Sequence, residues 1–195
     1  VRDASLHINR GEIVGLVGES LCEICCWDWH GAKLVIEHCD SYTEQNIEPQ
    51  KGFLSLSEEV KVINRIKEEQ NYKLGLTVNW GRSAIEGRKI EMPENHVQFS
   101  FNNGVLSGIM FSGVTEKTES LYGAWRDLHA PPAKAFDMQH YEDTSLMNFQ
   151  NIKNTLNSCD AKIIDYIGIK LLPLPSELSI SNRVGINRDA IKLLV

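Results

Sequence analysis

The sequence predicts an α/β fold in which about four parallel strands are covered by helices. From residue 27 onward, short apolar runs alternate with amphipathic stretches, and this alternation is typical of a parallel sheet joined by helical crossovers. The short runs are apolar along most of their length, as expected of strands that are buried on both faces. Polar residues follow these runs, and such residues gather at one edge of a parallel sheet, where ligands bind.

Four apolar runs are the predicted strands. They are residues 32–40 (AKLVIEHCD), 73–83 (KLGLTVNWGRS), 105–113 (VLSGIMFSG) and 162–175 (KIIDYIGIKLLPLP). Because the carboxyl ends of parallel strands meet at one edge of the sheet, the polar residues there should share a rim. Four residues are expected on this rim: Glu37, Asn79, Ser112 and Lys170.

Helical patterns lie between and after the predicted strands. Residues 55–70 combine a capping box, formed by Ser55 and Glu58, with one apolar and one charged face. Further helices are predicted over residues 92–104, over 144–158 with Thr144 as N-cap, and over the last segment of the chain. The polar stretch 114–143 is a long loop, and loops of that length are usually functional or disordered.

The first twenty residues, VRDASLHINRGEIVGLVGES, resemble the opening strands of ABC-transporter ATP-binding subunits. A phosphate-binding loop needs a glycine, four further residues, and then Gly-Lys-Ser/Thr. If Gly18 is the first glycine, the required positions hold Glu23, Ile24 and Cys25, so the phosphate cradle and its cation are missing. We therefore expect no nucleotide-binding residues and no ATP, and we divide the chain into an ABC-like remnant (1–23) and a main domain (24–195).

Composition limits the classes of protein to which the chain can belong. Its 195 residues suffice for one domain with a sizeable core. A net charge of −6 argues against a broad nucleic-acid-binding face. No apolar run reaches the roughly 18–20 residues of a membrane span, and the absence of a basic-then-apolar leader favours the cytoplasm.

The five cysteines are an odd set, and we expect them to be reduced thiols. A zinc site built from Cys22, Cys25 and Cys26 with nearby histidines is the alternative. That alternative is weakened because His38 and Cys39 fall in a strand pattern, where adjacent side chains point to opposite faces.

Residues 24–195 resemble the C-terminal half of an uncharacterised bacterial family of xylose-isomerase-like TIM barrels. The resemblance rests on six segments: WDWHGAKLVIEHCDSY, PQKGFLSL, VNWGRSAIEGR, LSGIMFSG, YGAWRDLHAPP and DYIGIKLLPLP. It implies an incomplete barrel, since a complete one has eight strands and about 250 residues. A half-barrel leaves two open sheet edges, so the resemblance also implies that the chain associates with another half or with itself.

The wider superfamily contains sugar isomerases, epimerases, endonucleases and dehydratases, many of which bind a divalent metal at the rim. The resemblance implies Mn²⁺, Mg²⁺ or Co²⁺ held by Glu37, Asp40 and His38. His38 points to the opposite face from Glu37, however, and this alternation favours a structural role for it. Such a metal polarises a carbonyl, and a carboxylate then removes the neighbouring proton.

The implied catalytic residues are Glu37, Lys170, which would stabilise an enolate, and His129. The implied substrate-binding residues are Asn79, Trp80, Arg82 and Ser112. His129 as a turn residue and Trp80 as a packing residue remain open alternatives.

The expected function is therefore that of a sugar isomerase or epimerase, or a lyase, acting on a sugar or hydroxy-carbonyl compound. One alternative is a truncated or chimeric polypeptide without catalysis, and another is a fragment of an ABC-transporter ATP-binding subunit.

Overall fold

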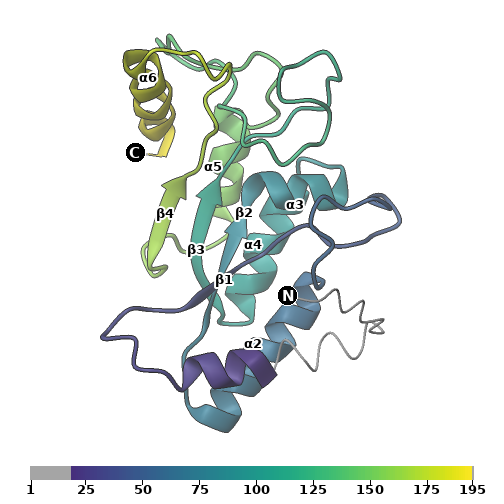
Figure 1. Cartoon of the computed structure of the whole chain (residues 1–195), viewed down its shortest axis with the longest axis vertical. Coiled ribbons are helices and arrows are strands. Elements are labelled where there is room, and N and C mark those ends of the chain that lie inside the picture. The colour runs from purple at the N-terminus through teal and green to yellow at the C-terminus, as the bar shows by residue number, and fades with distance from the viewer. Residues whose placement is uncertain (1–18, 195) are drawn as a thin grey trace, which may run out of the picture.

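The computed structural model describes residues 19–194, and its centre is a sheet of four parallel strands (Figure 1). The strands are β1 (Val35–Glu37), β2 (Gly75–Asn79), β3 (Leu106–Phe111) and β4 (Tyr166–Ile169). They are hydrogen-bonded to one another in chain order. The predicted α/β class with four parallel strands is confirmed, and each strand lies within its predicted segment.

The helices are α2 (Leu56–Gln70), α3 (Trp80–Gly87), α4 (Met92–Asn102), α5 (Phe149–Asn157) and α6 (Ile180–Ile191), followed by a 3₁₀ turn (Lys192–Leu194). The predicted capping box is present at the start of α2, where the Ser55 backbone N–H donates to the Glu58 carboxylate over 2.8 Å. The apolar face of α2 is buried through Val60, Ile63 and Ile66. Local sequence signals therefore located α2 well.

Two predicted boundaries are wrong. The second strand does not extend to residue 83, because the Asn79 side chain accepts a hydrogen bond from the Arg82 backbone N–H and so starts α3 directly. The N-cap of α5 is Asn148 and not Thr144, whose hydroxyl donates to Glu142 instead.

One face of the sheet packs against helices, whereas none of the helices within residues 19–194 covers the other face in the same way. Leu76 and Val78 of β2 are fully buried in the core, and Figure 1 shows α3, α4 and α5 on the same side of the sheet. On the opposite face, the Thr77 hydroxyl bonds the Tyr166 hydroxyl across β3. Gly108 makes this contact possible, because a Cβ there would lie 2.4 Å from the Tyr166 ring.

The long segment between β3 and α5 is ordered by packing. Isolated bridges join Gly113 to Ala130 and Thr115 to Ala124 and Ser145, and both Val114 and Met147 are buried in the core. In Figure 1 this segment lies at the upper end of the strands. It therefore presents residues 127–129 to the carboxyl ends of the sheet.

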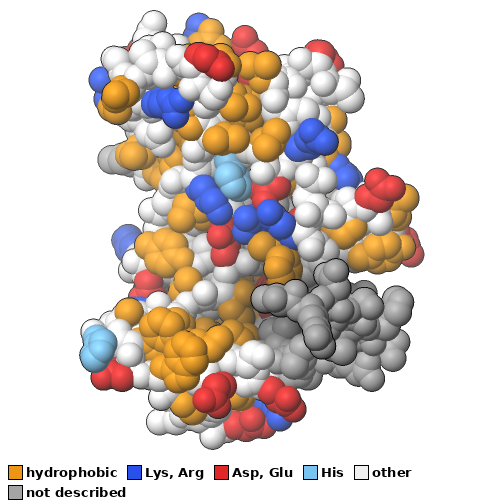
Figure 2. Space-filling view, viewed as in Figure 1, with side chains coloured by type: hydrophobic (Ala, Val, Ile, Leu, Met, Phe, Trp, Pro, Cys, Tyr) orange, Lys and Arg blue, Asp and Glu red, His pale blue; other side chains and the backbone are white. Residues whose placement is uncertain are grey.

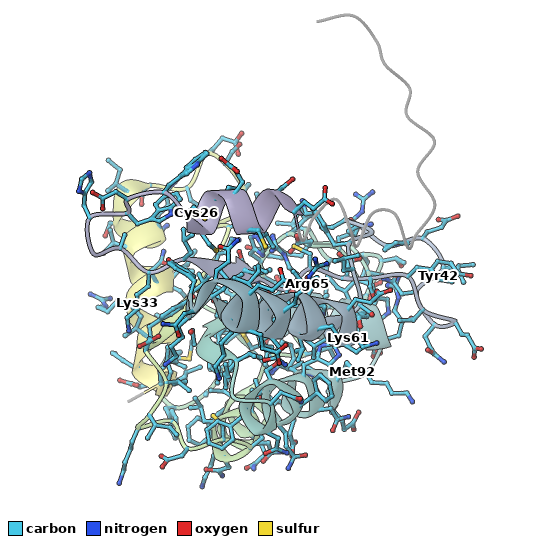
Figure 3. All side chains as sticks on the ribbon, turned by 90° about the horizontal axis from the view of Figure 1, so that it is seen from below. Cys26, Lys33, Tyr42, Lys61, Arg65 and Met92 are labelled. Carbon is cyan, nitrogen blue, oxygen red and sulfur yellow. The ribbon has the colours of Figure 1, made fainter. Side chains whose placement is uncertain are left out.

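Residues 19–25 form a helix that packs beside α2 through Leu21 and Cys25. Viewed from below, Cys26 marks the end of this helix, while Lys61 and Arg65 lie on α2 (Figure 3).

All five cysteines are free thiols. Most of the ABC-like stretch, residues 1–18, lies outside the described residues. Over 19–194, none of the helices has the length and apolar character that crossing a bilayer requires.

Candidate functional site

Three of the predicted rim residues meet at the carboxyl ends of the strands. The Glu37 carboxylate at the end of β1 accepts a hydrogen bond from Asn79 Nδ2 over 2.7 Å. Lys170 Nζ, just after β4, lies 3.3 Å from both Glu37 oxygens. Figure 2 shows acidic, basic and histidine side chains gathered in the middle of this face. Residues 133 positions apart in sequence thus form one cluster, which we call the rim cluster and define by Glu37, Asn79, Arg82, Asp127, His129 and Lys170.

Arg82 joins two carboxylates of the rim cluster. From the first turn of α3, its Nε donates to Asp127 over 3.1 Å, and one terminal nitrogen lies 3.4 Å from Glu37 Oε2. The same nitrogen lies 3.0 Å from the Cys39 sulfur. The side chain is only 9% exposed, so its guanidinium is already occupied by protein partners. The structure therefore places Arg82 between two carboxylates of the rim cluster, and its role in substrate binding stays a prediction.

Asn79 and Ser112 are also fully buried, and a chain of hydrogen bonds connects Ser112 through Asn79 to Glu37. The Ser112 hydroxyl donates to Asn79 Oδ1 over 2.7 Å, and the same oxygen accepts from the Arg82 backbone. With its oxygen occupied in this way, the Asn79 amide must turn its NH₂ group toward Glu37. In this structure the two side chains orient the Glu37 carboxylate, and their role as substrate contacts stays a prediction.

The loop after β3 contributes Asp127 and His129. His129 Nδ1 lies 3.2 Å from Asp127 Oδ1, but it is buried without a hydrogen bond. The His129 backbone has a φ of 53°, in the left-handed region that non-glycine residues seldom adopt and that is enriched at functional sites. Asp127 was not predicted, and its only sequence signal is its place two residues before His129 in RDLHAPP.

The cluster holds its titratable groups in defined states. Burial would raise the pKa of Glu37, but the hydrogen bond from Asn79 and the charges of Arg82 and Lys170 hold this pKa below its ordinary value. Burial lowers the pKa of His129, and the charges of Lys170 and Arg82 act in the same direction while Asp127 opposes them. The rim therefore combines a carboxylate that its neighbours hold in the charged form with an imidazole that burial holds in the neutral form.

Access to solvent differs among these groups. The side chains of Glu37 and Lys170 are 32% and 38% exposed, and that of His129 is 17% exposed. A ligand that reaches the rim would therefore meet these three side chains first.

Trp80 does not reach the rim. It is fully buried, and its indole N–H donates to the Thr155 hydroxyl of α5 over 3.1 Å. It follows the strand at the first position of α3, which turns its ring into the core. Its burial agrees with the alternative interpretation of Trp80 as a packing residue and leaves no ring face open to a ligand at the rim.

The three predicted metal ligands, Glu37 at the end of β1 and His38 and Asp40 just after it, are not brought together. His38 contacts Glu59 and Glu86 on the buried side of β1, because adjacent residues of a strand point to opposite faces. Asp40 accepts hydrogen bonds from the Asn46 side chain and from the backbone N–H groups of residues 50 and 51. Neither shares a contact with the carboxylate of Glu37.

The residues around Glu37 also fit a divalent cation poorly. Lys170 and Arg82 both place positive charge within 3.4 Å of its carboxylate, and a metal there would be repelled by both groups. The predicted rim metal therefore has no suitable donor set.

A different group of potential ligands lies within the described residues 19–194. His38, Glu86 and His96 each offer one ligand atom, and these atoms lie within 4.8 Å of one another. All three residues are buried. Glu86 and His96 were not predicted, because neither belongs to a recognisable metal-binding motif within its helix. Only the packing of α3 against α4 brings them to His38.

The electrostatics of this buried group are strongly coupled. Burial opposes charge on His38, but its hydrogen bonds to Glu59 and Glu86 raise its pKa to about 9. Burial likewise opposes charge on Glu86, yet the contacts with His38 hold its pKa at about 2. Burial, together with the charge of His38, lowers the pKa of His96 to about 3.

Comparisons with known proteins give a family but no activity. The family model described as "Domain of unknown function (DUF4862)" matches residues 12–186. A protein of Salmonella typhimurium (strain LT2), named "Uncharacterized protein STM3670", is 36% identical over 186 residues, which is 95% of this chain and 54% of that protein. The chain thus spans about half the length of this relative. No solved structure matches the chain.

Proposed function

The chain belongs to the DUF4862 family, and from that premise we propose that its rim cluster is an acid–base site for a sugar or a small hydroxy-carbonyl compound. The reaction class is proton abstraction next to a carbonyl, as in an isomerase, an epimerase or a lyase. The proposed architecture is the C-terminal half of a xylose-isomerase-like barrel. Four parallel strands, an uncovered sheet face and a relative about twice as long support this architecture.

The observation that carries the proposal is the partly exposed contact between Glu37 and Lys170 at the carboxyl ends of β1 and β4. Ligands of parallel α/β sheets bind at this edge. Lys170 would bind the carbonyl oxygen and stabilise the negative charge that develops on it during enolisation. Glu37 would hold the Lys170 side chain in place through the contact with both of its oxygens.

His129 is the proposed proton acceptor. Its lowered pKa keeps the imidazole neutral at neutral pH, so it can take a proton from carbon and return it to the same or a neighbouring carbon. Asp127, 3.2 Å from its Nδ1, would stabilise the imidazolium that forms. Glu37 is the weaker candidate for this role, because its cationic neighbours reduce its basicity.

The proposed chemistry needs no metal at the rim. If a divalent ion from the set Mn²⁺, Mg²⁺ and Co²⁺ takes part, it would have to bind away from Glu37, since Lys170 and Arg82 already neutralise that carboxylate.

Exchange of carbon-bound hydrogen tests the proposal. The chain is incubated in D₂O with a panel of aldoses, ketoses and hydroxy acids, and loss of the C–H signal next to the carbonyl is followed by proton NMR. Lys170→Met and His129→Gln should each lower the exchange rate by about 100-fold or more. Lys33→Met is the matched control, because Lys33 pairs with Asp165 near the opposite ends of the strands. Absence of exchange, or an equal loss in the control, would contradict the proposal.

A second candidate function is association without catalysis. Along α6, Ile180, Val184 and Ile191 are 82%, 58% and 52% exposed, which is a large apolar face for one helix. A half-barrel that buries such surfaces against another half would sediment as a dimer. A monomer at all concentrations, with the exchange activity present, would favour the acid–base site alone.

A further inference from the structure

The buried group of His38, Glu86 and His96 lies apart from the rim cluster. His38 follows β1 and is fully buried, Glu86 comes from α3, and His96 comes from α4. In Figure 1, α3 and α4 lie together on one side of the sheet. The three side chains therefore join a strand to two helices through the interior of the protein.

The two imidazoles present the same ring nitrogen to one carboxylate. His38 Nε2 lies 3.2 Å from Glu86 Oε2, and His96 Nε2 lies 3.7 Å from Glu86 Oε1. Ligand atoms around a tetrahedral zinc ion, with zinc–nitrogen bonds of about 2.0–2.1 Å, are separated by about 3.4 Å. The two distances run to different oxygens of Glu86, and one ligand atom from each residue lies within 4.8 Å of the others. The side chains would therefore have to move closer together to bind a zinc ion.

The other ring nitrogen of each histidine is held by a separate partner. His38 Nδ1 lies 2.8 Å from the Glu59 carboxylate, and His96 Nδ1 lies 3.0 Å from the Ser83 hydroxyl. Both ring nitrogens of His38 face carboxylates, which can only accept, so without a metal both carry protons. A bound metal would displace the Nε2 proton, while Nδ1 would keep the proton that it donates to Glu59. Histidines that bind metals are almost always anchored in this way.

A fourth polar group lies close to the cluster and has no partner. The Ser41 backbone N–H donates to Glu86 over 2.8 Å, while the buried Ser41 hydroxyl makes no hydrogen bond. Buried polar atoms without partners are rare in native proteins. The fourth position of a tetrahedral site would be taken by a water or by a group such as this hydroxyl.

Charge balance also favours a cation. Glu59 and Glu86 are two buried carboxylates, and among residues 19–194 the only cationic side chains within 4.0 Å of them are histidines. A protonated His38 balances only one of these two carboxylates. A divalent cation that displaces its Nε2 proton would balance both and leave the imidazoles neutral.

We propose that His38, Glu86 and His96 bind a zinc ion that ties β1 to α3 and α4. Two imidazoles and one carboxylate form a donor set that zinc commonly takes. The site is structural and not catalytic, because the three side chains are only 0%, 7% and 10% exposed and face away from Glu37. This inference is independent of the proposed function of the rim cluster.

Metal content and metal-induced stabilisation test the proposal. The purified chain is treated with EDTA and dialysed, zinc is added back, bound metal is counted by mass spectrometry, and the thermal midpoint is measured. We expect one zinc per chain and a midpoint that rises by several degrees. His96→Gln should bind no zinc at this site and should show no rise. His140→Gln is the matched control, because His140 bonds Asp189 elsewhere in the fold and should keep both responses.

Two further measurements keep the proposal falsifiable if His96→Gln fails to fold. Ser83→Ala keeps every ligand but releases His96 Nδ1, and zinc should then bind about tenfold more weakly. Cobalt substitution should give an absorption spectrum without a thiolate charge-transfer band. A strong thiolate band would instead assign the metal to the cysteines at 22, 25 and 26 and would overturn the proposal, as would full zinc binding by His96→Gln.

Discussion

Glu37 and His38 are neighbours in sequence but belong to two very different clusters. Glu37 turns to the partly exposed rim, where Lys170 and Arg82 surround its carboxylate with positive charge. His38 turns to the buried side, where its contacts are carboxylates and another imidazole. The rim therefore suits a polar organic ligand and the interior suits a cation. One peptide bond of a strand separates these two environments.

The comparison also separates catalytic expectations from structural ones. A group that touches substrate must reach solvent, and Glu37, Lys170 and His129 retain some exposure. His38 is fully buried, so a substitution of this residue should lower the free energy of unfolding before it affects activity. The predictions below test whether the two clusters are energetically distinct.

The largest effect is expected from Glu86→Gln in the buried cluster. Without metal, this change leaves His38 facing one carboxylate instead of two and weakens the hydrogen bond from the Ser41 backbone. Disruption of a buried ion pair commonly lowers the free energy of unfolding by about 3 kcal/mol. Urea unfolding of the wild type and of Glu86→Gln, in EDTA at pH 7, measures this difference in the free energy of unfolding.

The matched control for this measurement is Glu69→Gln. Glu69 pairs with Arg65 on the exposed surface of α2, so its loss should change the free energy of unfolding by less than about 0.5 kcal/mol. Equal effects of the two substitutions would show that the interior cluster carries no special stability.

An intermediate effect is expected from Arg82→Lys in the rim cluster. Lysine keeps the charge but cannot contact Asp127 and Glu37 together as the guanidinium does. The expected loss is about 1–2 kcal/mol in the free energy of unfolding. Arg65→Lys, at the exposed pair with Glu69, should be nearly neutral in the same urea titration. A neutral Arg82→Lys would mean that the fork-shaped contact does not stabilise the rim.

The smallest effect is expected from Glu37→Gln, and it should depend on pH. The folded-state pKa of Glu37 lies below its ordinary value of 4.5. Its carboxylate therefore contributes stability that is fully present above pH 4.5 and is lost as the pH falls through the folded-state pKa. Because the side chain is about one third exposed, we expect less than about 1 kcal/mol at pH 7.

Urea midpoints of the wild type and Glu37→Gln at pH 7 and pH 3 measure this dependence. The gap between the two proteins should narrow at the lower pH. A gap that stays constant would show that Glu37 is not stabilised by its cationic neighbours.

Residues 32–40 show how far a sequence pattern can go. Alternation along the strand predicts that Glu37 and His38 point to opposite faces, and their different partners agree with it. The same pattern did not exclude a shared metal site for Glu37, His38 and Asp40, because a short polar run after a strand can turn in several ways. Hydrogen bonds from residues 46, 50 and 51 hold Asp40 away from that site.

Trp80 and Asp127 mark the limit of sequence reasoning about the site. Both lie in segments for which the sequence predicted site residues. In the structure, Trp80 is buried in the core and Asp127 belongs to the rim cluster. The start of α3 at residue 80 redirected the tryptophan, and loop packing through Thr115 and Ala130 positioned the aspartate. Neither event has a strong local signature.

The sequence by itself determined the apolar runs, the helix signals and the alternation along the first strand, because these arise from interactions between residues close together in the chain. Only the tertiary structure decided which polar groups meet. Glu37 with Lys170 and His38 with Glu86 are separated by 133 and 48 residues, and such contacts depend on how whole helices and loops pack against the sheet. That packing is set by buried shape and volume across the molecule, which no short stretch of sequence contains.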